Sequence, residues 1–312
     1  MGYEKTGFRL LGNCEIDPKV NEVYKKNLHP KYNYLMDIRD FNKLAELPDE
    51  LYNLDILDGS PPCTVFSTAG KREADWGVEK QFREGQAKQT LDDLFFVFIE
   101  TVEKLRPKVV VAENVTGLIK GNARYYVSMI ISRFKDAGYD VQLFKLNSMY
   151  MDVPQKRERV FFIANRCGFP KLKLQFNHRQ ITFGEVRAEN GRPLKQSDDY
   201  RTAYQLLKHK IPSDNDLGDI NKRLYGKEKC FNQKILKDGE PSKTITANGS
   251  FYRWVDDCYA TEQDFSNVSS FPQDYDFSPM DAQYITGMSV PPNMMANIAT
   301  EIREQWFTKG GD

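Results

Sequence analysis

The chain has 312 residues, of which 40% are apolar and 28% are charged, and its 44 basic residues balance its 44 acidic residues. This length allows one large or two ordinary domains with a substantial core, and the composition is typical of globular proteins. Zero formal net charge excludes any inference of nucleic-acid binding from overall charge, so a basic surface must be local. The apolar runs are far too short to cross a bilayer and no signal peptide opens the chain, so we expect no membrane association.

The cysteines and histidines limit the possible metal chemistry. Five cysteines are scattered along the chain without CxxC spacing, and there are three histidines. An odd number of scattered cysteines indicates free thiols in a reducing compartment, so we expect a cytoplasmic protein. We also expect no metal site, structural or catalytic.

Short apolar runs alternate with helical stretches through the first half of the chain. This alternation is typical of a parallel sheet with crossover helices. Strands are expected at residues 8–17, 32–40, 53–63, 108–115, 139–147 and 159–165. Helices are expected at residues 18–30, 89–107 and 123–138.

The composition changes near residue 168. From there to about 280 the chain is polar, rich in loops and weakly periodic, which indicates a smaller separate domain or a large insertion. A final helix with a clear apolar face is expected at 291–307. We therefore expect one domain from residues 1–167 plus 281–312, with 168–280 inserted as a second domain.

Acidic residues and one thiol follow the expected strands. Glu15 and Asp17 end the first strand, Asp37 ends the second, Cys63 follows the third and Glu113 ends the fourth. Ligands of open parallel sheets bind outside the carboxyl ends of the strands, so these side chains are expected to share one crevice. For each acid taken alone, the alternative is a solvated strand end.

Cys63 and Glu113 form a chemically useful pair. Two prolines, Pro61 and Pro62, restrict the backbone just before the thiol, and a thiolate in a loop is an accessible nucleophile. Glu113 follows three valines, an apolar setting that favours a protonated carboxyl able to donate to a ring nitrogen. This pair suits addition to an aromatic heterocycle such as a pyrimidine, whereas acyl transfer would need a histidine base, for which His29 is poorly placed.

A basic stretch follows in "VPQKRERVFFIA". Gln155, Arg157 and Arg159 alternate into a strand, and this period of two sends both arginines to one side. Guanidinium groups bind carbonyl oxygen, carboxylate and phosphate, so they could hold a base and steady the carboxylate. The alternative is a solvated run of charges.

In order and spacing, these segments resemble the cytosine-5 DNA methyltransferase family, and the resemblance covers most of the chain. The segments that carry it are "NCEID", "MDIRD", "SPPCTVFS", "ENV", "QKRERVFFIA", "PSKTITANG", "SSFPQDY" and "GMSVPPNMMANIA". The resemblance implies that Cys63 adds to carbon 6 of a flipped-out cytosine while Glu113 assists at nitrogen 3. Arg157 and Arg159 would hold the base and the carboxylate.

The resemblance also implies contacts with the cofactor S-adenosylmethionine and with the substrate. Glu15 would hold the ribose hydroxyls, Ile16 would pack on the adenine and Asp37 would accept from its amine. Further cofactor contacts are expected at Ile38, Pro61, Ser289 and Val290. Substrate contacts are expected at Pro62, Ser67, Asn114 and Gln155.

The implied fold is an α/β, Rossmann-like S-adenosylmethionine-dependent methyltransferase sheet with an inserted, smaller target-recognition domain at 168–280. The expected partner is double-stranded DNA, read by a monomeric restriction–modification enzyme of a bacterium or phage. Two alternatives remain: the same chemistry on RNA, and an inactive methyltransferase-like DNA-binding protein.

Two departures from the family pattern bear on the cofactor. The chain aligns from just after the family's first strand and glycine-rich loop, so we expect it to bind the cofactor weakly as it stands. Met288 occupies a position where the family usually has asparagine, which removes one polar contact near the cofactor.

Overall fold

The structure is a computed structural model that describes residues 1–61, 93–120, 123–194, 198–227 and 229–308. The chain forms two compact units. The sheet unit comprises Phe8–Leu146, Glu158–Leu174 and Thr300–Asp312; the insert unit comprises Met1–Gly7, Asn147–Arg157 and Gln175–Ala299. These are backbone units, and the functional division into residues 1–167 plus 281–312 and 168–280 stays a prediction.

The sheet unit contains two separate β-sheets. One is a parallel pair of strands, β1 (Gly12–Glu15) and β2 (Tyr32–Leu35). The other has four strands in the order β3-β4-β6-β5. Its strands are β3 (Ile56–Gly59), β4 (Val109–Val115), β6 (Glu158–Asn165) and β5 (Asp140–Asn147). The expected strands are therefore present, although the described residues divide them between two sheets.

The expectation of an all-parallel sheet is wrong for the last strand. β3 and β4 are parallel, with Gly59 opposite Ala112, but β4 and β6 are antiparallel, with Val115 opposite Arg159. The connection from β5 to β6 is short and contains no crossover helix. Two parallel neighbouring strands would need such a helix, so β6 runs in the opposite direction. The antiparallel pairing brings the start of β6 to the carboxyl end of β4.

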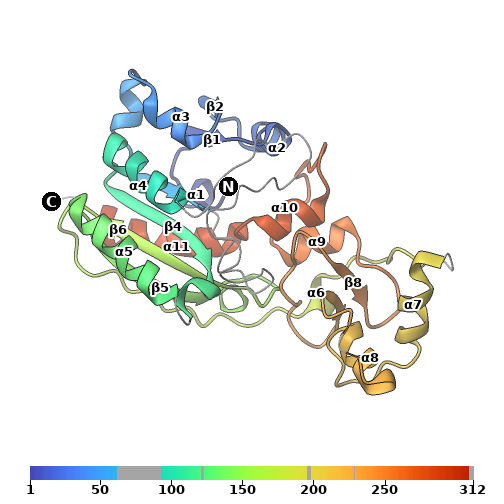
Figure 1. Cartoon of the computed structure of the whole chain (residues 1–312). Helices are drawn as coiled ribbons and strands as arrows, with labels where there is room; N and C mark the ends of the chain where they lie inside the picture. The colour runs from blue at the N-terminus through green and yellow to red at the C-terminus, as the bar shows by residue number, and fades with distance from the viewer. Residues whose placement is uncertain (62–92, 121–122, 195–197, 228, 309–312) are drawn as a thin grey trace. The chain divides into compact units, whose positions relative to one another are not determined.

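Three helices of the sheet unit lie within their expected ranges, and a further helix begins within residues 32–40, which were expected to form the second strand. These helices are α2 (Pro18–Leu28), α3 (Ile38–Lys43), α4 (Leu94–Leu105) and α5 (Ala123–Asp136). Asp17 and Asp37 cap the first two, because each carboxylate accepts from backbone N–H groups of the first turn. Apolar side chains of α4 and α5 pack with alternate residues of β4 and β6, so both helices cover one face of the larger sheet (Figure 1).

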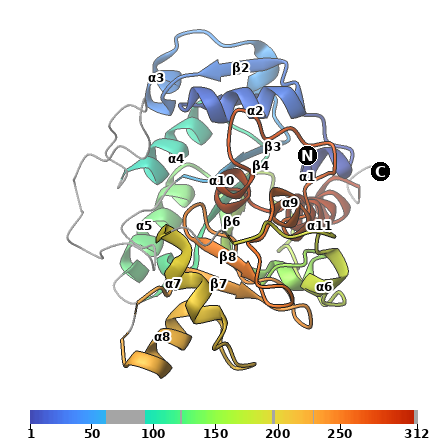
Figure 2. The same ribbon diagram turned by 90° about the vertical axis from the view of Figure 1, so that its right-hand side faces the viewer.

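The insert unit is built around a two-stranded parallel sheet of β7 (Gln233–Leu236) and β8 (Ser250–Arg253). Helices α7 (Asp198–Leu207) and α8 (Leu217–Tyr225) pack on the face that carries Ile235 and Tyr252 (Figure 2). Helices α6 (Phe183–Val186) and α9 (Glu262–Val268) pack with Leu236 and Phe251, which alternate to the other face. A core therefore lies on each side of this small sheet.

The remaining helices lie near the two ends of the chain. They are α1 (Gly2–Lys5), α10 (Ala282–Met288) and α11 (Pro292–Ile302). The expected helix at 291–307 is confirmed as α11, followed by a wider helical turn at Arg303–Phe307. In the part of the chain that the structure describes, no helix is long and apolar enough to span a membrane.

Candidate active site

The carboxylate of Glu113 and the guanidinium of Arg159 form an ion pair in the sheet unit. Arg159 Nε lies 2.7 Å from Glu113 Oε1, and the side chains are 15% and 14% exposed for Arg159 and Glu113 respectively. The register explains the contact, because Arg159 is opposite Val115 and therefore diagonal to Glu113 on the same face of the antiparallel pair. Burial lowers the pKa of the Arg159 guanidinium, and the negative charge of Glu113 opposes that shift.

Asn114 connects this pair to the end of β3. Its buried side-chain amide donates to the backbone carbonyl of Pro61 over 3.0 Å, and its Oδ1 accepts from the N–H of Val115. Pro61 is the last described residue before the segment that holds the predicted nucleophile. The predicted residues Pro62, Cys63 and Ser67 lie outside the described residues. The backbone of Pro61 is thus held by Asn114, the residue next to Glu113.

The predicted adenosine-contacting residues lie at the carboxyl ends of β1 and β2. Glu15 is paired with Leu35, and the N–H of Met36 donates to the carbonyl of Glu15, so Asp37 follows directly at the neighbouring strand end. Glu15 accepts from the N–H of Asp17 over 2.8 Å. Asp37 accepts from the N–H of Arg39 over 2.8 Å. The guanidinium of Arg39 also lies 3.5 Å from Asp37 Oδ2.

Ile16 and Ile38 flank the same strand ends. Ile16 is partly buried next to Glu15, and Ile38 is the first residue of α3, where it packs against the core below α4 and α5. This arrangement places two carboxylates and two apolar side chains around adjacent parallel strand ends. It fits an adenosine moiety, whose ribose offers hydroxyl donors and whose ring offers an apolar face.

The pKa of the Cys14 thiol depends on the negative charges at these strand ends. The thiol lies 3.6 Å from the carbonyl oxygen of Met36. Local desolvation, followed by the negative charges of Glu15 and Asp37, raises the pKa of Cys14 to about 12, although the residue as a whole is exposed. Glu15 and Asp37 therefore both raise the pKa of the same thiol.

Arg157 and Gln155 are part of the insert unit, where their side chains are buried. Arg157 donates from Nη1 to the carbonyl of Ile245 and from Nη2 to the carbonyl of Gly287, each over 2.9 Å. Gln155 accepts from the N–H of Ile245 and donates to Ser269 Oγ. These contacts join segments far apart in sequence, which indicates a positioning role. Their predicted roles at the reacting base stay predictions.

Ser289 and Val290 follow α10 in the insert unit. The hydroxyl and N–H of Ser289 both donate to the carbonyl of Ile285, so this residue closes the helix. Gly287 is needed just before it, because a Cβ there would lie 2.3 Å from the backbone nitrogen of Ala247. The segments "PSKTITANG" and "GMSV" therefore pack directly on each other. Met288 is 59% exposed.

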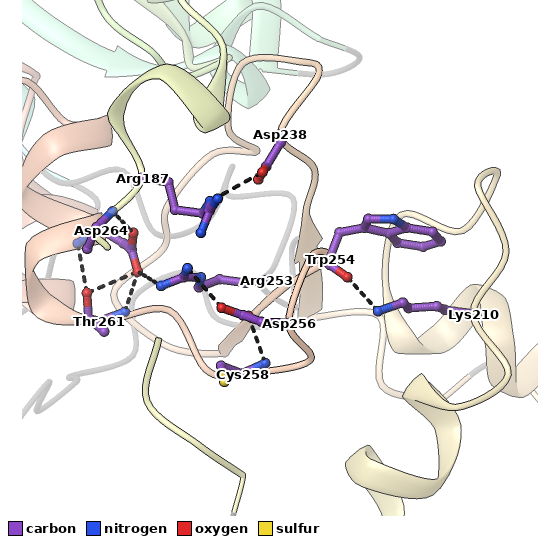
Figure 3. Close-up of polar contacts among 10 residues, drawn as sticks. Arg187, Lys210, Asp238, Arg253, Trp254, Asp256, Cys258, Thr261 and Asp264 are labelled. Carbon is purple, nitrogen blue, oxygen red and sulfur yellow. Dashed lines mark hydrogen bonds and ion pairs between the residues drawn. The ribbon is translucent and has the colours of Figure 1, made fainter. Parts of the chain in front are cut away.

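A second buried arginine was not singled out by sequence reasoning. Arg253, the last residue of β8, is 0% exposed and lies 2.9 Å from Asp256 and 3.8 Å from Asp264 (Figure 3). Asp264 also forms a capping box with Thr261 at the start of α9 and accepts from the N–H of Ala188. The signal was weak, because "FYRWVDD" reads as an ordinary solvated strand end.

Figure 3 also shows Lys210, which contacts Trp254, the residue directly after Arg253. Lys210 donates to the carbonyl of Trp254 over 2.5 Å, pairs with Asp257, and lies 4.8 Å from the centre of the Trp254 ring. Arg187 pairs with Asp238 over 3.3 Å. The Lys210–Asp257 pair holds the loop after β8, whereas the Arg187–Asp238 pair joins the end of α6 to the turn after β7. Among the described residues, no group of histidine, cysteine, aspartate or glutamate side chains is arranged to hold a metal ion.

Comparison with known proteins assigns the chain to a family. The profile of the C-5 cytosine-specific DNA methylases matches residues 1–304. The chain is 28% identical to the type II methyltransferase M.Sau96I of Staphylococcus aureus over 97% of this chain and 72% of that protein. It is 30% identical to the type II methyltransferase M.NgoFVII of Neisseria gonorrhoeae over 97% of this chain and 82% of that protein.

Solved structures show the same fold. A putative DNA modification methyltransferase encoded within an Escherichia coli prophage matches with a TM-score of 0.65 at 15% identity, covering 97% of this chain and 94% of that one. A DNMT2 variant of Spodoptera frugiperda matches with the same TM-score at 14% identity, covering 96% of this chain and 95% of that one. The expected methyltransferase fold is confirmed. With its profile match across residues 1–304, the chain belongs to the C-5 cytosine-specific DNA methylases.

Proposed function

We propose that the protein transfers a methyl group from S-adenosylmethionine to carbon 5 of a cytosine within a short, specific sequence of double-stranded DNA. The observation that carries this proposal is the Glu113–Arg159 ion pair, held beside the backbone of Pro61 by Asn114. A carboxyl group, a guanidinium and the start of a cysteine loop at one sheet edge form a set suited to activating a pyrimidine ring.

Each residue of this site would have its own role in the reaction of a flipped-out cytosine. The thiolate of Cys63 adds to carbon 6, and Glu113 stabilises the electron pair that moves onto nitrogen 3 by donating a hydrogen bond or proton there. Carbon 5 becomes nucleophilic as a result and can take a methyl group. Loss of the carbon 5 proton then lets the thiolate leave, which restores the aromatic ring and the free enzyme.

Arg159 would keep Glu113 in place during these steps. Its guanidinium is a fixed, charged donor next to the carboxylate, so it orients Glu113 toward the ring and offers further N–H groups to the base. The low exposure of both side chains strengthens their interaction, because little water competes for it. Arg157 and Gln155 would support the site indirectly by joining the segments they bind.

S-adenosylmethionine supplies a methyl group activated by its sulfonium. We propose that Glu15 binds the ribose hydroxyls, that Asp37 accepts from the adenine amine, and that Ile16 and Ile38 contact the ring. The fit is supported by the adjacent carboxylates at the ends of β1 and β2. Pro61, Ser289 and Val290 remain proposed contacts for the rest of the cofactor.

The insert unit is proposed to read the DNA sequence, and the enzyme is proposed to act as a monomer. The relatives M.Sau96I and M.NgoFVII are type II methyltransferases of bacteria, and a further relative is an orphan methyltransferase of a Bacillus phage. These relatives support a restriction–modification role and action on DNA in a bacterial cytoplasm.

Transfer of labelled methyl groups tests the proposal. The purified chain is incubated with S-adenosylmethionine carrying a labelled methyl group and, in parallel, with plasmid DNA and with transfer RNA. Label on cytosine in DNA is the expected result. Label on transfer RNA alone would instead support an RNA methyltransferase, and DNA binding without any label would support an inactive DNA-binding protein.

A further inference from the structure

Arg39, in the first turn of α3, contacts two carboxylates that belong to different segments of the sheet unit. Its Nη2 lies 2.5 Å from Asp93 Oδ1, and its Nη1 lies 3.5 Å from Asp37 Oδ2. Asp37 is the proposed acceptor of the adenine amine, and Asp93 is the first described residue after the segment that holds the predicted nucleophile. One guanidinium therefore connects a proposed cofactor contact to the start of α4.

The two contacts of Arg39 differ in strength. The distance of 2.5 Å to Asp93 is that of a short, charge-assisted hydrogen bond, whereas the 3.5 Å to Asp37 is at the outer limit for any hydrogen bond. The guanidinium is therefore held mainly by Asp93 and only loosely by Asp37. Because Arg39 stays at this long distance, Asp37 Oδ2 can still accept from a nearer donor such as an amine of a ligand.

The other carboxylate oxygen of Asp37 is bound to the backbone. Oδ1 accepts from the N–H of Arg39 over 2.8 Å and so caps α3. A carboxylate bound through one oxygen can still turn about that contact, and the guanidinium beside Oδ2 limits this rotation. The backbone and the side chain of Arg39 thus both affect the direction in which Asp37 Oδ2 points.

The first turn of α4 fixes the position of Asp93. The carbonyl of Asp93 accepts from the N–H groups of Phe96 and Val97 over 2.8 Å and 3.0 Å. In the described part of the chain, its carboxylate makes no capping hydrogen bond with α4, so it is available to Arg39. The Asp93 side chain is 54% exposed, and an ion pair with such a partner adds little to stability. Its effect is therefore expected in the orientation of Arg39.

Further hydrogen bonds join α3 to α4, which lie side by side (Figure 1). Asn42 donates to the carbonyl of Val97 and accepts from the hydroxyl of Thr101. Lys104 donates to three backbone carbonyls at the end of α3, one of which is that of Asn42. The two helices are therefore held together beyond the ion pair, which keeps Arg39 next to the start of α4.

We propose that Arg39 is a positioning residue for the cofactor: held by Asp93, its guanidinium keeps Asp37 Oδ2 directed at the adenine amine without occupying that oxygen. Loss of Arg39 would leave the Asp37 carboxylate freer to turn. Loss of the charge of Asp93 would let the guanidinium move onto Asp37 and compete with the amine. This inference rests on the proposed function, which assigns the adenine amine to Asp37.

The test compares the affinity of the full chain for two ligands by equilibrium dialysis. They are S-adenosylhomocysteine and its 6-deamino analogue, in which hydrogen replaces the adenine amine. The unmodified protein should prefer S-adenosylhomocysteine by about 10- to 100-fold, the range for one hydrogen bond to a charged group. Arg39→Gln should reduce this preference to about 3-fold or less. Arg39→Lys should keep part of it, because an ammonium retains the charge but lacks the planar fork.

The ratio of the two affinities separates positioning from a merely structural role, since a general loosening of the site would weaken both ligands alike. Asp93→Asn should reduce the preference as Arg39→Gln does. The double variant should lose no more than either single variant, because both residues act through one contact. The matched control is Lys43→Gln, which removes an exposed cation of the same helix that pairs with Asp40. Lys43→Gln should leave the preference unchanged.

The outcomes distinguish this inference from the proposed function. If the unmodified protein prefers S-adenosylhomocysteine and Arg39→Gln or Asp93→Asn retains that preference in full, the positioning role is overturned and the proposed function stands. If the unmodified protein binds both ligands equally, the inference fails together with the proposed contact between Asp37 and the amine. If it binds neither ligand at millimolar concentration, the inference and the proposed use of S-adenosylmethionine both fail.

Discussion

Arg159 Nε lies 2.7 Å from Glu113 Oε1 across the β4–β6 pair, so the carboxyl group predicted to act on the base is held by one guanidinium. Glu113→Gln keeps the shape and removes the acid, so methyl transfer should fall by about 10²- to 10⁴-fold while DNA affinity changes little. Single-turnover transfer of labelled methyl groups measures the first effect and anisotropy measures the second.

The partner residue gives a separate prediction. Arg159→Ala should slow methyl transfer to a similar degree, because Glu113 loses the group that orients it in a site with little water. Arg159→Lys should recover only part of the rate, since an ammonium lacks the planar fork of the guanidinium. The expectation fails if Arg159→Ala transfers methyl groups as fast as the unmodified protein.

Arg157 is predicted to act on the fold of the insert unit. Arg157→Leu removes two buried hydrogen bonds and leaves the carbonyls of Ile245 and Gly287 without these donors. Each unsatisfied buried group costs about 1–3 kcal/mol, so for these two carbonyls we expect the free energy of unfolding to fall by about 2–6 kcal/mol. Urea denaturation measures this change.

A surface arginine in the same unit is the control for Arg157. Arg179 is 72% exposed and pairs with Glu185, so Arg179→Leu should change the free energy of unfolding by at most about 0.5 kcal/mol. Equal stability of the Arg157→Leu and Arg179→Leu proteins would contradict the positioning role inferred for Arg157.

Arg253 should show the large effect expected of a buried charge. Removing one partner by Asp264→Asn leaves the Arg253 cation with less compensation and also weakens the cap of α9, so unfolding should become easier by about 3–5 kcal/mol. The exposed pair of Lys31 and Glu50 serves as the control, because Lys31→Gln should leave the denaturation midpoint nearly unchanged. Similar denaturation midpoints for the two variants would contradict this prediction.

Alkylation of Cys14 tests the charge at the proposed adenosine site. Its raised pKa of about 12 means that the thiolate fraction, and hence the alkylation rate, should keep rising as pH increases from 7 to 10. Asp37→Asn removes a negative charge that raises this pKa, so it should lower the pKa and speed alkylation at any fixed pH in that range. Exposed Asp40→Asn is the matched control, and peptide mass spectrometry follows the single site. An unchanged alkylation rate in Asp37→Asn would show that the Asp37 carboxylate does not affect the Cys14 thiol and would contradict this prediction.

Much of the sheet unit could be predicted from the sequence. Runs such as "KVVVAENV" identify buried strands, and Asp17 precedes a predicted helix that its carboxylate caps. The short helix that Asp37 caps was not predicted. The Glu113–Arg159 contact agrees with the predicted closeness of the two residues. The apolar pattern of each strand does not encode its partner, so the antiparallel β4–β6 pair could not be deduced.

The insert unit was much harder to predict. β7 and β8 have four residues each, too short for a reliable period. The partners of Arg157 lie 88 and 130 residues away, so only the folded chain shows that it binds backbone carbonyls. The acids that pair with Arg253, Asp256 and Asp264, follow it closely in sequence, but only the folded chain shows that its guanidinium is buried between them.

The most direct measurement of the central claim is covalent capture on duplex DNA that contains 5-fluorocytosine, with S-adenosylmethionine present. Fluorine at carbon 5 cannot leave as a proton does, so the adduct between carbon 6 and the attacking thiol should persist. We predict an adduct that survives denaturing electrophoresis, that maps to Cys63 by mass spectrometry, and that Cys63→Ser abolishes while exposed Cys167→Ser retains it. An adduct that persists in the Cys63→Ser protein, or its absence while the unmodified protein methylates DNA, would contradict the proposed mechanism.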